Sequence, residues 1–193
     1  MGLLTVLVLS TACSSGGGGS KPASTSGRSV AATSARPTGP ATAGPNLRPG
    51  EKPPVLAVAA KTPTAAGAKS FATYFVQAVD WGMATTDPYL ISAVSEPSCR
   101  ACQGYVQSLT AMRAQGDSIR GARIQVVSAG IMRGTLPVKA DCGVELVIRQ
   151  QIAVAVPAGS AAPTTDGGAD QDYARVYVDW TGAGWRVVEQ TER

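Results

Sequence analysis

The chain has 193 residues, with 17 lysines and arginines against 13 aspartates and glutamates, and it contains no histidine. This length suits one domain of ordinary size. Histidine is the commonest acid–base side chain near neutral pH and the commonest metal ligand, so its absence excludes Ser-His-Asp sites, Cys-His sites and histidine-based zinc sites. The net charge of +4 comes from residues 1–61, which carry +5, while residues 62–193 carry −1. Basic residues of the second part are scattered among acids, so we expect no nucleic-acid binding.

Residues 1–12 are expected to be a signal peptide. Gly2 to Leu9 form an apolar run that is too short to span a bilayer, and small residues lead from it to Cys13. This pattern resembles a bacterial lipoprotein signal, in which the cysteine becomes the mature N-terminus and carries a diacylglyceryl group. The resemblance implies lipidation of Cys13 and a membrane anchor on the extracytoplasmic face. The alternative is an ordinary secretory signal or a truncated anchor that leaves Cys13 with a free thiol.

Residues 13–61 are expected to form a disordered linker behind the lipidated cysteine. They are rich in Gly, Pro, Ala, Ser and Thr and contain no aromatic residue. Such a composition cannot bury enough apolar surface to offset the loss of chain entropy on folding. The folded domain is therefore expected to cover residues 62–193.

Helical patterns fill the first part of that domain. Thr62-Pro63 is typical of a helix start, and apolar residues at helical spacing predict a helix over about 63–84. Asp87 is expected to cap a short helix that ends near Val94. A third helix is expected to begin at Ser98, as its cap, and to end at Gly116.

The period then changes to two, which indicates strands. An early strand is expected over 122–132, followed by a long alternating run over 138–156 with a bend or bulge at 149–151. Two further strands, from Ala174 to Trp180 and from Trp185 to Thr191, flank a hairpin turn at 181–184. Residues 157–169 are expected to form a loop.

Three helices followed by a bent antiparallel sheet of about four strands predict an α+β fold. This order resembles the nuclear-transport-factor-2-like (cystatin-like) cone. The stretch from Gly67 to Phe75 and the segment Cys99-Arg100-Ala101-Cys102 resemble those of actinobacterial lipoproteins that carry a small domain of unknown function. The resemblance covers about residues 52–193. It implies a cellular location and a fold, with no established activity.

The cysteines form the one chemical motif of the domain. Three pairings among Cys99, Cys102 and Cys142 are open, and an exported protein meets an oxidising compartment. A Cys99–Cys102 disulfide is the favoured pairing. The alternative is a thiol–disulfide redox protein that uses Cys99 and Cys102 at a helix start. No second Cys-x-x-Cys accompanies them, so we expect no zinc site, and no motif implies another metal or a cofactor.

A cone of this kind can enclose a pocket between its helices and its sheet. Six side chains are candidates to line it: Tyr74, Trp81, Tyr89, Tyr105, Asp141 and Trp180. The competing interpretation places the aromatic rings in the core and the carboxylate in solvent. Without a catalytic constellation, the residues favour a non-catalytic module that binds a cell-envelope protein or a small ligand.

The lipoprotein interpretation is tested by the Cys13→Ser variant. We expect this variant to leave the membrane fraction for the soluble fraction, because serine cannot accept the diacylglyceryl group that anchors the chain. Cell fractionation and blotting of both proteins measure the change. A variant that stays in the membrane fraction would contradict the interpretation.

Overall fold

The computed structural model describes residues 39–161 and 169–192. The expected signal peptide (1–12), Cys13 and residues 14–38 of the expected linker lie outside this part. The elements in chain order are the 3-10 helix η1 (Val58–Lys61), the helices α1 (Ala65–Thr85), α2 (Tyr89–Val94) and α3 (Arg100–Gln115), and the strands β1 (Ser118–Gly121), β2 (Ile124–Ile131), β3 (Cys142–Gln151), β4 (Ala153–Val156), β5 (Ala169–Trp180) and β6 (Trp185–Glu192). The predicted α+β class is confirmed.

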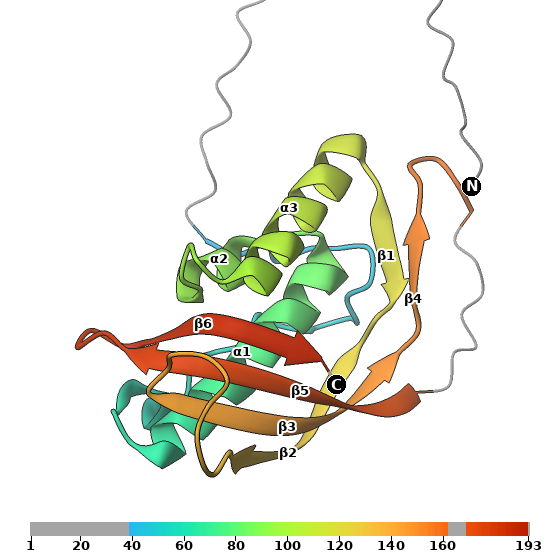
Figure 1. The fold of residues 1–193 in the computed structure, drawn as a ribbon. Helices are drawn as coiled ribbons and strands as arrows, with labels where there is room; N and C mark the ends of the chain where they lie inside the picture. The colour runs from blue at the N-terminus through green and yellow to red at the C-terminus, as the bar shows by residue number, and fades with distance from the viewer. Residues whose placement is uncertain (1–38, 162–168, 193) are drawn as a thin grey trace, which may run out of the picture. The chain divides into compact units, whose positions relative to one another are not determined.

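The strands form two antiparallel sheets. The larger has the order β2-β3-β5-β6, and the smaller consists of β1 and β4. The long strand expected over 138–156 begins at Cys142 and breaks at Ile152, next to the expected bend, where β4 leaves for the small sheet. The segment that pairs with it also breaks into two strands at this level. Gly121 at the end of β1 pairs with Ala153 of β4, and Ile124 at the start of β2 pairs with Gln150 of β3. Figure 1 shows β1 and β4 rising side by side from one end of the larger sheet.

One face of the larger sheet is buried under the helices. The alternation expected for β3 is present, since Val144, Leu146 and Ile148 are all buried, and the same holds for Ala174, Val176 and Val178 on β5. Helix α1 packs on this face through Phe71 and Phe75, with α3 beside it (Figure 1). Within the described residues, no helix is both long and apolar enough to cross a membrane.

The structured part of the chain begins earlier than the boundary expected at residue 62. Residues 39–57 lie against the domain: the Ala41 amide donates to Asp87 Oδ2 at 2.7 Å, and the Asn46 side chain donates to the Gly121 carbonyl at 2.6 Å. Trp81 Nε1 donates to the Ala41 carbonyl at 3.0 Å. Buried polar partners supplied by the domain thus order a segment whose composition alone predicts disorder.

The helix caps differ in detail from those expected. Helix α1 is capped by Thr64, whose hydroxyl accepts the Gly67 amide at 3.0 Å, and α3 is capped by Cys99 in place of Ser98. Pro88 occupies the cap position of α2, and Asp87 instead binds the Ala41 amide and Arg113. Gly116 ends α3 in the left-handed region as expected, with φ of 74°.

Gly121 is required by the corner between β1 and β2. Its φ is +70°, and an added Cβ would lie 2.1 Å from the Ile152 carbonyl oxygen. Gly121→Ala should therefore destabilise the fold by about 2 kcal/mol or more. The control is Gly104→Ala at an exposed position of α3, where no atom lies within 4 Å of the added Cβ. Alanine should stabilise the helix there by about 1 kcal/mol. Urea unfolding measures both, and equal effects would contradict this account of the corner.

Candidate functional site: a polar cleft between α1 and β2

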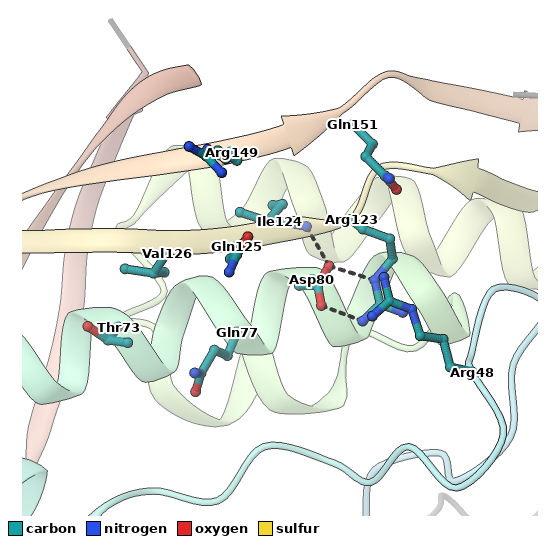
Figure 2. Close-up of a pocket in the computed structure, with 10 residues that line it drawn as sticks. All are labelled: Arg48, Thr73, Gln77, Asp80, Arg123, Ile124, Gln125, Val126, Arg149 and Gln151. Atoms are coloured by element: carbon teal, nitrogen blue, oxygen red, sulfur yellow. Dashed lines mark hydrogen bonds and ion pairs between the residues drawn. The ribbon is translucent and has the colours of Figure 1, made fainter. Parts of the chain in front are cut away.

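A polar cleft of about 660 Å³ lies between helix α1 and the edge strand β2. Figure 2 shows α1 running along one side of the cleft and β2 along the other. We call it the α1–β2 cleft. Its lining residues come from the N-terminal segment, α1, β2 and β3: Arg48, Thr73, Gln77, Asp80, Arg123, Ile124, Gln125, Val126, Arg149 and Gln151.

Arg123 is held on every side. Its Nε and Nη2 donate to the two oxygens of Asp80 at 3.1 and 2.8 Å, and Nη1 and Nη2 donate to the two oxygens of Glu51, the former at 3.0 Å. Nη1 also donates to the Asn46 carbonyl at 3.2 Å. A guanidinium has five N–H donors. These five bonds match that number, which leaves Arg123 no donor for a ligand.

The carboxylates of Glu51 and Asp80 are both engaged by hydrogen bonds from Arg123. The hydrogen bonds from Arg123 lower the pKa of Glu51 to about 2, and Glu51 in turn raises the pKa of Arg123. Asp80 Oδ1 also accepts the Ile124 amide at 2.8 Å. This carboxylate therefore stabilises the first amide of β2 as well as the guanidinium.

Two further arginines of the cleft are differently placed. Arg48 and Arg149 are exposed, and neither side chain has a hydrogen bond or ion pair within the described part of the chain. Arg149 lies opposite Gln125 on the outer face of the sheet. Since all donors of Arg123 are taken, Arg149 and Arg48, which also attracts Glu51, are the guanidinium groups with donors left for an anionic ligand.

The six side chains expected to line one pocket are not gathered into one. Tyr74 and Trp81 are buried in α1, and Tyr89 packs against the small cluster around Trp81 and Leu90. Desolvation raises the pKa of Tyr74. These three side chains belong to the core or its margin, as the competing interpretation of the sequence held.

The other three candidates lie at two separate places. Tyr105 of α3 donates to Glu192 at 3.0 Å, and burial, together with the Glu192 charge, raises its pKa to about 12. Asp141 accepts the Trp180 amide at 2.8 Å just before β3, and the Trp180 ring packs edge-on against Trp185. The fold thus brings Asp141 and Trp180 together, away from Tyr105.

The space between the helices and the sheet is almost filled. Phe75, Val79, Ile148 and Tyr105 are among the residues that line a cavity of about 20 Å³, which is room for about one water molecule. A cavity of this size is too small for a metabolite. It is therefore not the ligand-sized pocket that the sequence led us to expect between the helices and the sheet.

Cys99 and Cys102 lie at disulfide distance, with their sulfur atoms 2.06 Å apart. Both residues are fully buried at the start of α3. Since a redox cysteine must be reached by its partner thiol, this burial favours a structural bridge over the redox alternative. Cys142 has no disulfide partner among the described residues and is half-buried, and burial followed by the Asp141 charge raises its thiol pKa. Within the described residues, no cluster of three or more Cys, Asp or Glu side chains is placed to hold a metal ion.

The sequence interpretation missed the α1–β2 cleft. Arg48 and Glu51 counted as linker charges, and Arg123 and Arg149 as scattered surface charges. One signal was present in the helix: Thr73, Gln77 and Asp80 recur at i, i+4 and i+7, which places a polar stripe on an otherwise apolar helix. The contacts of Arg123 join residues far apart in the sequence, so no local spacing of residues indicates them.

The model of a family described as "Family of unknown function (DUF6318)" matches residues 48–191. No curated protein matches the chain. Among solved structures, the chain is similar to the crystal structure of the intermembrane space region of the chloroplast protein ARC6. The two are 14% identical with a TM-score of 0.44, over 64% of this chain and 95% of that one.

The contacts of Glu51 predict a pH-dependent contribution to stability. Its pKa falls from 4.5 to about 2 on folding, so the stabilisation is present above pH 4.5 and is lost as the pH falls through about 2. We expect Glu51→Gln to destabilise the protein at pH 7 by on the order of 2 kcal/mol, after allowance for partial solvent exposure.

The matched control is Glu145→Gln, which breaks the surface pair with Arg175. It should cost about 0.5 kcal/mol or less. Urea unfolding of wild type and both variants between pH 2 and 7 measures these effects. A Glu51→Gln deficit that stays constant over this range would contradict the assignment.

Proposed function

The chain belongs to the DUF6318 family, whose function is unknown. From the residues of the chain itself, we propose that it is a non-catalytic binding module. Its domain holds an anionic ligand in the α1–β2 cleft. The observation that carries this proposal is the presence of Arg48 and Arg149 beside the cleft without an ion-pair partner among the described residues. Two guanidinium groups around a concave polar surface suit carboxylate or phosphate groups.

The chemistry of the cleft supports binding without catalysis. A general acid or base must be able to exchange a proton with the substrate. Asp80, the one carboxylate lining the cleft, has both oxygens bonded to Arg123, and its Oδ1 also accepts the Ile124 amide. The remaining polar side chains are three guanidinium groups, three amides and a hydroxyl, which do not act as general acids or bases near neutral pH. Hydrogen bonding is what these groups supply.

We further propose that the module is an actinobacterial-type lipoprotein, anchored through a lipid on Cys13 at the outer face of the cytoplasmic membrane. The apolar run and small residues before Cys13 support this address. The Cys99–Cys102 pair is consistent with an oxidising compartment. Ligands at that address include cell-envelope proteins and small anions.

The cone resemblance belongs to the same proposal. Helices α1 and α3 cover one face of an antiparallel sheet, as in a nuclear-transport-factor-2-like domain. The central cavity of about 20 Å³ is too small for a ligand. We therefore place ligand binding outside the cone, at the edge strand β2. The domain would thus use the cone as a scaffold.

Citrate is a suitable probe for the anionic site. We expect saturable binding of citrate to the full chain, weakened by salt because it depends on charge. Arg149→Gln should reduce the affinity about tenfold, the effect of losing one charge-assisted contact. Isothermal titration calorimetry measures both proteins.

The control is Arg133→Gln, which removes the same charge from an exposed position outside the cleft. This variant should bind citrate like wild type. Absence of citrate binding, or an equal loss in both variants, would overturn the proposed site.

A further inference from the structure

We infer that the ligand of the α1–β2 cleft is an extended acidic peptide segment, which adds as a strand to the outer edge of β2. This inference rests on the proposed function and names the class of its ligand. It combines three observations: the open edge of β2, the polar stripe of α1 and the two arginines, Arg48 and Arg149, that form no ion pair with another described residue.

The outer edge of β2 carries backbone groups that β3 does not use. Strand β2 is first in the order β2-β3-β5-β6, so within the described residues a strand lies on one side of it only. The Arg123 carbonyl accepts the Gln151 amide at 3.0 Å, which places residue 123 in a hydrogen-bonded pair with β3. Backbone groups alternate in direction along a strand, so Gln125 also faces β3, while Ile124 and Val126 face outward.

One of these outward groups confirms the direction. The Ile124 amide donates to Asp80 Oδ1 at 2.8 Å, on the side away from β3. The next outward pair of groups, the N–H and C=O of Val126, borders the cleft. A register shift follows between Val126 and Ser128. An added strand would pair with Val126 and end near this bulge, since bulges interrupt strand pairing.

Helix α1 supplies the opposite wall. Figure 2 shows Thr73 and Gln77 on the part of α1 that runs beside β2, before Asp80. The Gln77 side chain is exposed and can both donate and accept hydrogen bonds. A chain lying between α1 and β2 would meet backbone groups on one side and the Gln77 amide on the other. Strand addition at a sheet edge is an established way to bind an extended peptide.

The charges select an acidic peptide. Arg149 lies on β3 opposite Gln125, and neighbouring strands are about 4.8 Å apart, so an added strand would run about 10 Å from the β3 backbone. The combined lengths of an arginine and a glutamate side chain cover that distance. Arg48 reaches the cleft from the N-terminal segment. Opposite charges across the added strand stabilise it.

A second copy of the chain fits this edge less well. Two β2 edges paired about a twofold axis would bring the Arg149 side chains of both copies toward the same interface, and like charges disfavour such pairing. Charge complementarity therefore favours an acidic segment from another molecule over self-association.

The test uses the full chain and three labelled peptides in fluorescence anisotropy. The peptides are four Glu-Thr repeats, the same sequence N-methylated at every residue, and four Lys-Thr repeats. Pairing with β2 requires peptide N–H groups, so we expect the first peptide to bind at least tenfold more tightly than the methylated one, and the Lys-Thr peptide to show no binding. Arg149→Gln should weaken binding of the Glu-Thr peptide, whereas Arg133→Gln should not.

Amide hydrogen exchange gives an independent readout. On binding of the Glu-Thr peptide, exchange of the Val126 amide should slow at least tenfold, because that amide becomes bonded. The Gln125 amide, which faces β3, should change little. Slowing at both positions, or at neither, would overturn the strand pairing.

The remaining outcomes separate the two proposals. If the methylated peptide binds as well as the unmethylated one, or if only citrate binds, the strand inference fails while the anionic site stands. If neither peptide nor citrate binds, both fail. A dimer in analytical ultracentrifugation that excludes the Glu-Thr peptide would show that β2 pairs with a second copy, and would also overturn the inference.

Discussion

The five hydrogen bonds of the Arg123 guanidinium are the contact on which the functional part of the structure depends. They join the N-terminal segment through Asn46 and Glu51 and helix α1 through Asp80 to Arg123, the residue just before β2. One planar group thereby sets the spacing of three segments that are distant in the sequence. The same contact uses every donor of Arg123, and leaves Arg48 and Arg149 as the cleft arginines with donors for a ligand.

The backbone before Arg123 is arranged to place it there. Gly121 and Ala122 both have positive φ, of 70° and 52°, so the chain turns sharply between β1 and β2. Alanine in the left-handed region costs about 1 kcal/mol. The burial of Ala122 and the ion pairs of Arg123 offset this cost. The corner also splits the sheet in two, since β4 departs from β3 opposite it. The site and the division of the sheet therefore have a common origin.

The fold could be predicted from the sequence further than the site. Local periodicity located α1, α3 and the strands, because apolar residues at spacings of 3.6 and 2 report directly on burial. Strand β1 was missed, since four residues are too few for a pattern. The cleft depends on contacts between Glu51, Asp80 and Arg123, which are up to 72 residues apart. Composition also misassigned residues 39–61, because their order comes from partners in the domain.

The central claim is that Arg123 holds the N-terminal segment and α1 against β2. Amide hydrogen exchange of the full chain, in wild type and in Arg123→Gln, tests it most directly. The account predicts that the amides of Ala41 and Asn46, which are bonded to Asp87 and Ala84, exchange slowly in wild type and at least tenfold faster in the variant. Amides in the centre of β3 should be unchanged. Equal exchange of the 41–51 segment in both proteins would contradict the claim.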